Sequence, residues 1–363
     1  MKYFIITFGC QMNKSDSERI ATILEGKGYQ PASKENEADL IVVNMCSVRQ
    51  SAVDRVYGLF PKFKKLKEKN KKIKTVLTGC ILKEDKRKFA KRFDLILNIK
   101  NLQNWPKILK KESNVVITMP WHNYYISCDY LKVKPKYQNN FSAFVPISNG
   151  CNNFCSYCVV PFTRGPLICR NHNEILKETK DVVQKGFREI WLLGQNVNDY
   201  TSPADPSINF PKLLKMVNDI PGDFQIRFTS PNPKNFSDEL IEVISNSEKV
   251  AKYLNLPVQS GDNQILKKMN RPYTVEQYKN LVKKIRKKIP DINLSTDVIV
   301  GFPGETKKQF ENTIKLFKEI KFNIAYIAKY SPRPGTAAFQ MKDNVPLEEK
   351  KRREKCLRNL LSS

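Results

Sequence analysis

Histidine is almost absent from this chain. Only two histidines, His122 and His172, occur among its 363 residues. Zinc sites built from cysteine and histidine, and nucleophilic cysteine–histidine pairs, are therefore poorly supplied. The nine cysteines are an odd number in a chain without an export signal, which argues against a disulfide framework and for thiolates that act as ligands in a reducing compartment.

Long apolar stretches are also missing. No run approaches the roughly 18 consecutive apolar residues that a spanning helix needs, and the N-terminus lacks the pattern of a signal peptide. We therefore expect a cytoplasmic protein without a membrane-bound part. Apolar residues make up 40% of the chain and charged residues 27%, which is typical of globular domains. Its length predicts two folded units.

Acidic residues are few beside the basic ones. The chain has 63 Lys and Arg against 36 Asp and Glu, a formal net charge of +27. Such a field attracts polyanions, so nucleic acid is the leading partner. Eight lysines lie within residues 62–74, and nine basic residues lie within 267–288. A lysine-rich composition with merely solvated side chains is the alternative.

Short apolar runs and amphipathic stretches alternate along the first hundred residues. Strands are expected at 3–7, 40–44 and 75–77, and helices at 15–26 and 51–67. This alternation predicts a parallel sheet with crossover helices in a first unit, residues 1–112. A stretch without clear period follows, and we place the inter-domain linker at 113–140.

From residue 141 the alternation resumes. Strands are expected at 144–148, 189–193, 225–228, 253–256, 297–300 and 324–329, and helices at 173–184, 237–243, 275–288 and 307–319. Six strand–helix repeats over residues 141–340 predict a barrel or partial barrel of parallel strands. A basic, helical segment over 341–363 ends the chain.

Three cysteines stand within eight residues, directly after the first strand of the second unit. Cys151, Cys155 and Cys158 form a C-x-x-x-C-x-x-C pattern. Three such thiolates can hold three irons of a 4Fe-4S cluster and leave the fourth iron open to another ligand. A zinc site completed by Cys169 and ordinary packing cysteines are the alternatives, but packing cysteines rarely cluster so closely.

A second trio is spread along the first unit. Cys10, Cys46 and Cys80 each follow the carboxyl end of an expected strand. In a parallel sheet these ends share one edge, where open α/β sheets bind their ligands. One such cysteine would be explained as a small buried apolar residue. Three at one edge favour a second iron–sulfur site.

Seven motifs carry a family resemblance. The barrel trio, with Tyr157 before its last cysteine, resembles the radical S-adenosylmethionine (SAM) superfamily. The seven motifs, one of which contains the barrel trio, are GCQMN at 9–13, CSVR at 46–49, CNNFCSYCVVPFTRG at 151–165, LGQNVN at 193–198, PVQSG at 257–261, GFPGET at 301–306 and YSPRPGT at 330–336. Together they resemble the MiaB branch of the methylthiotransferases over nearly the whole chain.

The resemblance implies a fold and a reaction. It implies a Rossmann-like parallel α/β domain followed by a partial (β/α)6 radical SAM barrel. It also implies two 4Fe-4S clusters, one on each trio, and two SAM molecules that together replace the C2 hydrogen of N6-isopentenyladenosine, next to the anticodon of tRNA, with a methylthio group. An electron donor such as flavodoxin or ferredoxin and a monomeric state are further expectations.

Roles for other residues follow from the same resemblance. The six cysteines are expected to be the catalytic and metal-binding groups. Contacts with SAM are expected from Tyr157, Arg170, Gln195, Asn196, Gln259, Gly301 and Gly304. Contacts with substrate or RNA are expected from Gln11, Asn13, Arg164, Arg271 and Arg333. A tight turn, a helix cap and solvated surface arginines are the simpler explanations of several of these residues.

The sequence departs from the family pattern at three places. The family usually continues into a small RNA-binding barrel, the TRAM domain, and we expect it to be absent because the chain ends at Ser363. Residues 166–170 differ from the charged residues usual there, and Asn232 and Asn255 stand where relatives often have His. An RNA-binding iron–sulfur protein without turnover therefore stays open, as does a methylthiotransferase for threonylcarbamoyl-adenosine or a ribosomal protein.

Overall fold

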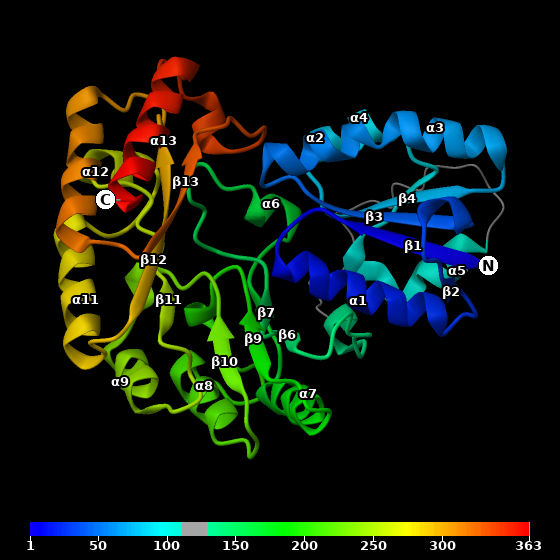
Figure 1. The fold of residues 1–363 in the computed structure, drawn as a ribbon, viewed down its shortest axis with the longest axis horizontal. Coiled ribbons are helices and arrows are strands. Elements are labelled where there is room, and N and C mark those ends of the chain that lie inside the picture. Colours follow the sequence, from blue (N-terminus) through cyan, green and yellow to red (C-terminus); the bar gives the residue numbers. More distant parts are fainter. Residues whose placement is uncertain (111–128, 363) are drawn as a thin grey trace.

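Two units lie side by side in the computed structural model, which describes residues 1–110 and 129–362 (Figure 1). The first unit holds a parallel sheet in the order β2-β1-β3-β4-β5. Its strands are β1 (Lys2–Thr7), β2 (Gln30–Pro31), β3 (Leu40–Cys46), β4 (Lys74–Cys80) and β5 (Leu95–Ile96). The predicted parallel α/β unit is confirmed, with one of the two common doubly wound strand orders.

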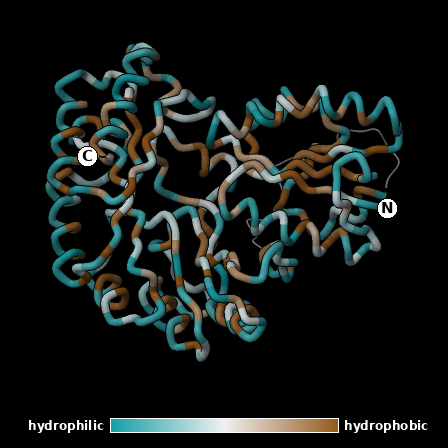
Figure 2. The backbone as a smooth tube through the Cα atoms, in the orientation of Figure 1, coloured by the Kyte–Doolittle hydropathy of each residue, from teal (hydrophilic) through white to brown (hydrophobic). Residues whose placement is uncertain are grey.

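Helices cover both faces of this sheet (Figure 1). One apolar core joins the sheet to α1 (Gln11–Glu25), η2 (Ile99–Asn104), α5 (Trp105–Leu109) and η3 (Asp129–Lys132). A second core joins it to α2 (Gln50–Gly58), α3 (Phe60–Lys69) and α4 (Lys83–Phe89), while η1 (Glu35–Glu37) precedes β3. Figure 2 shows the strands as the apolar centre between more polar helices.

The helix predicted over 51–67 is broken in two. The break falls at Leu59, between α2 and α3, and Pro61 occupies the first turn of α3. Proline has no N–H to donate and its ring clashes with the carbonyl four residues back, so one continuous helix cannot pass through this position. The first turn of a new helix tolerates it.

The second unit is a partial barrel of six parallel strands. They are β6 (Ser142–Pro146), β9 (Glu189–Leu193), β10 (Gln225–Phe228), β11 (Tyr253–Asn255), β12 (Asn293–Val300) and β13 (Ile324–Lys329). Two sets, β6-β9-β10 and β11-β12-β13, are joined by a parallel bridge between Ile226 and Val250. No pairing joins β6 to β13 among the described residues, so the wall is open there.

An outer layer of helices follows the strands. It consists of α7 (His172–Gln184), α8 (Phe210–Asn218), α9 (Asp238–Asn246), α10 (Asn263–Lys268), α11 (Val275–Lys288) and α12 (Lys307–Ile320), with the turns η4 (Val197–Asp199) and η5 (Pro233–Asn235). Capping boxes from Thr274 and Thr306 explain why α11 and α12 begin where they were predicted. The predicted basic terminal helix is α13 (Leu347–Ser362), which packs along β13 and places Leu357 in the barrel core.

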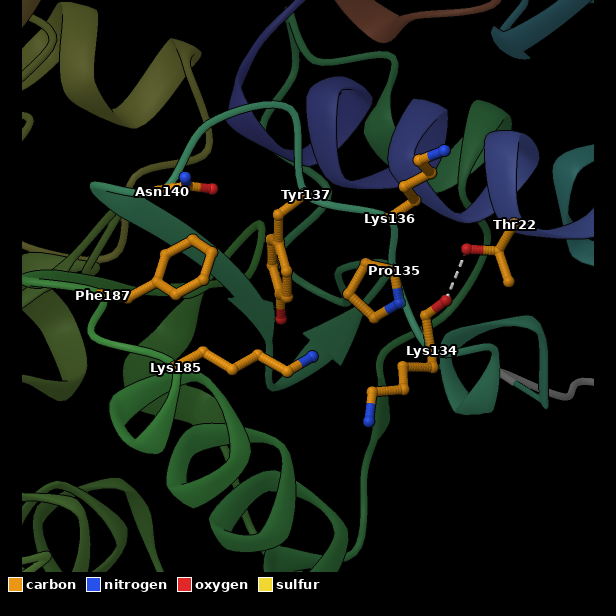
Figure 3. A pocket seen from close by; sticks show the side chains of 8 residues that line it. All are labelled: Thr22, Lys134, Pro135, Lys136, Tyr137, Asn140, Lys185 and Phe187. Carbon is orange, nitrogen blue, oxygen red and sulfur yellow. Dashed lines mark hydrogen bonds between the residues drawn. The ribbon is translucent and has the colours of Figure 1, made fainter. Parts of the chain in front are cut away.

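The described part of the predicted linker packs against both units. Tyr130 and Leu131 join a core of the first unit, and the ring of Tyr137 lies 4.9 Å from that of Phe187 in the barrel. Residues 113–128 of that prediction lie outside the described residues. A shallow pocket opens beside the crossing, lined by Thr22, Lys134, Pro135, Lys136, Tyr137, Asn140, Lys185 and Phe187 (Figure 3). Because Asn140 and Phe187 precede β6 and β9, this pocket faces the amino ends of the barrel strands.

The units meet where α1 lies along β6, the strand at the open edge of the barrel. Ser15 Oγ donates a hydrogen bond to the carbonyl of Phe144 at 3.3 Å, and Arg19 Nη2 lies 2.9 Å from Glu178 Oε1 on α7. The first unit therefore approaches the barrel at the edge that lacks a neighbouring strand. Among the described residues, no helix has the length and apolar character needed to cross a membrane.

Candidate active site

The three cysteines of the first unit, Cys10, Cys46 and Cys80, gather at one edge of the parallel sheet. Cys46 and Cys80 end β3 and β4 and face each other in register. Cys10 precedes α1 as its N-cap, just beyond β1, which pairs with β3 on the other side. The strand order reverses between β1 and β3, and open α/β sheets bind ligands at this point. The three cysteines share one sheet edge, as predicted, but only Cys10 lies past its strand, because β3 and β4 extend further than predicted and include Cys46 and Cys80 as their last residues.

Buried polar contacts hold this edge in shape. Asn13 Nδ2 donates to Asn44 Oδ1 at 2.9 Å and to the carbonyl of Met45 at 3.1 Å, and its Oδ1 accepts from the Cys10 thiol at 3.5 Å. A Cβ on Gly79 would stand 2.2 Å from the Met45 carbonyl oxygen, so only glycine fits there. Asn13 is fully buried and supports the Cys10 loop, whereas Gln11, predicted beside it as an RNA contact, is partly exposed.

The barrel trio, Cys151, Cys155 and Cys158, lies on a loop enclosed by two short antiparallel strands, β7 (Ser148–Asn149) and β8 (Ile168–Cys169). The loop also contains α6 (Val160–Thr163). Gly150 has a φ of 88°, and a Cβ there would stand 1.9 Å from the carbonyl oxygen of Pro166. The amide of Cys151 donates to the carbonyl of Gly165 at 3.1 Å. The strand ends and this close approach give the cysteine loop a fixed start.

The far end of the loop rests on α10. The amide of Ser156 donates to the carbonyl of Met269 at 3.0 Å, and its hydroxyl donates to the carbonyl of Lys268 at 2.7 Å. Phe154 adopts a positive φ of 44°, and Asn270 Nδ2 donates to its carbonyl at 2.9 Å. Asn270 and Ser156 are supporting residues that the motif alone did not reveal, because their contacts are with backbone more than 100 positions away.

Burial and a neighbouring buried cation set the electrostatics of the barrel trio. Burial raises the pKa of Cys158 to about 12 and also raises that of Cys151. Arg271 Nη1 lies 3.4 Å from Cys155 Sγ, and its Nη2 donates to the carbonyl of Pro257 at 3.3 Å. Arg271, predicted as an RNA contact, is thus buried behind a cysteine. Tyr157 packs beneath the loop, against an apolar cluster that includes Phe302 and Tyr330.

Arg164 joins the two trios. It follows the barrel cysteines on the same loop, and its Nε donates to Cys80 Sγ at 2.9 Å. Its Nη2 lies 2.7 Å from Asp16 Oδ2 on α1, and both side chains are buried. Since its three nitrogens all have partners within the protein, Arg164 has no free surface for an RNA phosphate. This corrects the expected RNA contact of Arg164.

Arg333 and Arg170, the other two arginines predicted to contact RNA or SAM, also have partners within the protein. Arg333, on the loop after β13, donates from Nη1 to Gln50 Oε1 at 2.6 Å, four residues beyond Cys46. Arg170 donates to the carbonyl of Pro146 at 2.7 Å and pairs with Glu178 at 2.8 Å. Among the described residues, no side-chain hydrogen bond or ion pair joins Arg170 to a cysteine, so its expected SAM contact stays a prediction.

Two polar residues predicted for SAM lie beside the barrel trio. Gln195 Oε1 accepts the amide of Gly150 at 2.5 Å, which ties the loop after β9 to the start of the cysteine loop. Asn196 is 2% exposed, and its Oδ1 has no hydrogen-bond partner among the described residues. Such a buried acceptor needs a donor from a ligand or water. Gln259, which is also predicted for SAM, has a positive φ of 69°, and its backbone N–H donates to the backbone carbonyl of Asp297 at 2.8 Å.

The glycine loop after β12 is supported by the terminal helix. Gly301 has a φ of 68°, and a Cβ there would stand 2.3 Å from Lys350 Cγ on α13. Glu305 Oε2 accepts the amide of Gly301 and Nη1 of Arg353, each at 2.6 Å. Gly304 has a φ of 76° and lies beside Lys268. A turn, η6 (Ala337–Gln340), closes the same side through the amide of Ala338, which donates to Ser156 O at 2.7 Å.

The donor sets suit iron–sulfur clusters better than single ions. Among the described residues, no three His, Cys, Asp or Glu side chains are placed so that they could hold one metal ion. A 4Fe-4S cluster binds each thiolate through a different iron, so its ligands stand further apart than those of a single ion. Each trio offers three thiolates beside a buried arginine, which fits a negatively charged cluster with one iron left open.

Comparison with known proteins places the two units in named families. Residues 145–317 match the radical SAM superfamily, and residues 2–99 match the uncharacterized protein family UPF0004. The chain is 44% identical over 357 residues to the tRNA-2-methylthio-N(6)-dimethylallyladenosine synthase of Clostridium novyi, covering 96% of this chain and 78% of that relative. It is 43% identical to the protein of the same name from Carboxydothermus hydrogenoformans, covering 97% and 81%.

Solved structures share the fold at low sequence identity. The radical SAM methyltransferase TsrM from Kitasatospora setae superposes with a TM-score of 0.62 at 13% identity, over 93% of this chain and 77% of that one. The cobalamin-dependent SAM radical enzyme OxsB has a TM-score of 0.65 at 12% identity, over 87% and 51%. With the sequence relatives, this shows that the chain belongs to the MiaB family of radical SAM methylthiotransferases.

Proposed function

We propose that this enzyme converts N6-isopentenyladenosine next to the anticodon of tRNA to its 2-methylthio derivative. The names of the relatives from Clostridium novyi and Carboxydothermus hydrogenoformans describe the synthesis of this product, in which the dimethylallyl group is the isopentenyl group. The observation that carries the proposal is the pair of cysteine trios, one on each unit, joined by Arg164.

Six cysteines would hold the two clusters of this reaction. Cys151, Cys155 and Cys158 would hold the cluster that binds SAM, and Cys10, Cys46 and Cys80 would hold the auxiliary cluster. When bound, these groups supply the electron, the carbon radical and the sulfur that the reaction needs. A flavodoxin or ferredoxin is the proposed source of the electron.

Other residues would bind and orient the cofactor and the base. Gln195 and Asn196 follow β9 beside the barrel trio, and Asn196 Oδ1, which has no hydrogen-bond partner among the described residues, is the atom available for the polar part of SAM. Gly301 and Gly304 have positive φ angles in the loop after β12, with Lys350 and Lys268 beside them, and this loop is the proposed contact of the SAM nucleoside. The purine would lie between the trios, because both the radical and the sulfur must reach its C2 carbon.

The charge of the molecule supports a tRNA partner. A net charge of +27 supplies the phosphate attraction that does not depend on sequence. Exposed aromatic rings near the barrel trio, at Phe154 and Phe162, are suited to stacking on the unpaired bases of an anticodon loop. Gln11, partly exposed beside Cys10, is the proposed contact of the first unit.

The test is a direct assay of the product. The full chain is reconstituted anaerobically with iron and sulfide, then incubated with SAM, dithionite and an isopentenylated anticodon stem-loop. Mass spectrometry of the digested nucleosides should show the methylthio derivative, together with release of 5′-deoxyadenosine. A stem-loop without the isopentenyl group is the matched substrate control and should give far less product.

Two other outcomes would decide against the proposal. Tight binding of the stem-loop by a protein with both clusters intact, without 5′-deoxyadenosine, would indicate an RNA-binding iron–sulfur protein without turnover. Product formed only with threonylcarbamoyl-adenosine RNA or a ribosomal protein would change the acceptor. A monomeric state and a cytoplasmic location stay predictions.

A further inference from the structure

The position of Arg164 calls for a role other than RNA binding. The residue belongs to the loop of the barrel cysteines, yet its guanidinium reaches the edge of the other unit. From this geometry we infer that Arg164 is a positioning residue that raises the reduction potential of the auxiliary cluster, and that Asp16 opposes this effect. The inference rests on the proposed auxiliary cluster at Cys10, Cys46 and Cys80.

The direct contact is with a cluster ligand. Arg164 Nε donates to Cys80 Sγ at 2.9 Å, and the arginine side chain is only 4% exposed. Reduction adds a negative charge to a cluster and its sulfurs, and a cation with a hydrogen bond to sulfur stabilises that charge. Because burial excludes water, the effect is screened little by solvent. The reduced state is therefore favoured, which makes the potential less negative.

Asp16 acts in the opposite sense through the same cation. Its Oδ2 lies 2.7 Å from Arg164 Nη2, and its side chain is fully buried. Among the described residues, no hydrogen bond joins the Asp16 carboxylate to a cysteine, and its Oδ1 has no hydrogen-bond partner. Arg164 therefore contacts the cluster ligand Cys80 directly, whereas the carboxylate of Asp16 contacts Arg164 and not Cys80. Neutralising either partner changes the charge near Cys80, but with opposite signs.

The guanidinium is also fixed by contacts from two other segments. Its Nη1 donates to Asn149 Oδ1 at 3.0 Å and to the hydroxyl of Tyr130 at 3.4 Å. Asn149 ends β7, directly before the barrel cysteine loop. Arginine presents several donors in a rigid plane, whereas lysine offers one ammonium. The contacts thus hold the charge at one place relative to Cys80 and link its position to the loop of the other trio.

The experiment measures the auxiliary cluster alone in the full chain. Cys151, Cys155 and Cys158 are replaced by alanine, and the protein is reconstituted anaerobically with iron and sulfide. The reduced fraction is then followed by electron paramagnetic resonance at fixed potentials. Arg164→Gln should lower the ratio of reduced to oxidised cluster at least tenfold at the parent's midpoint, about 59 mV for a one-electron couple. Asp16→Asn should raise that ratio.

A matched arginine separates electrostatics from packing. Arg19 is also fully buried, and it also forms an ion pair across the boundary between the units, with Glu178. Its guanidinium bonds to Leu131, Ser15 and Glu178 rather than to a cysteine. Arg19→Gln should leave the potential unchanged even if the protein is less stable. Arg164→Lys keeps the charge and should restore part of the shift caused by the glutamine variant.

Each result bears on the inference. A shift of the same sign in Arg164→Gln and Asp16→Asn, or none in either, would overturn it. If Arg164→Gln does not fold, a raised potential in Asp16→Asn supports the inference and an unchanged one refutes it. Failure of the parent triple-alanine protein to bind iron would overturn the auxiliary cluster itself. Normal iron content without a shift would overturn only the role of Arg164.

Discussion

At the scale of single residues, the cysteines divide into ligands and ordinary packing residues by their surroundings. Cys80 is buried at a sheet edge and contacts a buried arginine, while Cys356 on α13 packs against the barrel core. Both are free thiols in the structure. Their different neighbours predict different effects of the same substitution.

Cys80→Ala should remove about half of the iron bound after anaerobic reconstitution, because a trio reduced to two thiolates holds a 4Fe-4S cluster poorly. Iron and sulfide analysis of the purified protein measures this loss. Cys356→Ala is the matched control and should keep the full iron content. Equal iron in both variants would show that the first unit holds no cluster.

Gly150→Ala should destabilise the barrel cysteine loop more than an ordinary strained glycine would. The new Cβ would stand 1.9 Å from the Pro166 carbonyl oxygen, in addition to the strain of a φ of 88°. Gly186 has a similar φ of 83° but nothing within 4 Å. We expect Gly186→Ala to cost about 1 kcal/mol and Gly150→Ala about 3 kcal/mol or more. Urea denaturation and iron content measure both, and equal costs would contradict the close approach.

At the scale of elements, α1 serves the fold and the site together. Its first residues follow Cys10, its inner face carries Asp16, and further along it meets residues 136–138 through Glu18. Burial raises the pKa of Glu18 to about 7, and its Oε2 has no hydrogen-bond partner among the described residues. The charged carboxylate is therefore disfavoured in the folded state.

Glu18→Gln should stabilise the protein at pH 8 by about 1–3 kcal/mol. Because the pKa of Glu18 is raised in the folded state, its protonated side chain contributes its full share to the free energy of unfolding below the ordinary pKa of 4.5. This contribution is lost as the pH rises to about 7. The advantage of the glutamine variant should therefore appear between those pH values and vanish near pH 4. Denaturation at several pH values tests this, and a destabilised variant at pH 8 would contradict it.

Glu25, at the end of the same helix, is the control with the opposite sign. Desolvation alone would raise its pKa, but hydrogen bonds from Lys136 and Tyr3 hold the pKa of Glu25 below its ordinary value. A lowered pKa contributes stability above the ordinary value and loses it as the pH falls. Glu25→Gln should therefore destabilise the protein at pH 8, with the difference shrinking in acid.

At the scale of the whole molecule, charge and architecture act together. The net charge of +27 attracts polyanions such as the proposed RNA, while the two units place the trios near the seam at the open edge of the barrel. The shallow pocket of Figure 3 lies towards the amino ends of the barrel strands, and its Lys134 and Lys136 form ion pairs with Asp181 and Glu25. Ligands of parallel barrels bind at the carboxyl ends, where the cysteines lie.

Affinity for an anticodon stem-loop should fall steeply with salt. If about six phosphates are neutralised, the affinity should drop about 10³-fold between 50 and 200 mM salt, because bound counterions are released. Filter binding or fluorescence anisotropy over that range gives the slope. A mixed-sequence hairpin should show the same slope with weaker affinity, and a slope near zero would contradict an electrostatic interface.

Local patterns in the sequence predicted the elements and the cysteine positions. Strand and helix periods depend on nearby residues, so the starts of α11 and α12 and the cysteines at the carboxyl ends of β1, β3 and β4 could be derived from the chain itself. The split of the helix over 51–67 was missed, although Pro61 was a visible signal.

Only the tertiary structure decided what the arginines do. The family resemblance predicted Arg164, Arg271 and Arg333 as contacts with substrate or RNA, and the sequence cannot distinguish a solvated cation from a buried one. Arg164 and its partner Asp16 are separated by 148 positions, and no local period connects them. The fold brings α1 against the open barrel edge, removes water from both groups and places the cation on Cys80. Chain neighbours determine the strands and loops, whereas burial and partners across the seam exist only after the units dock.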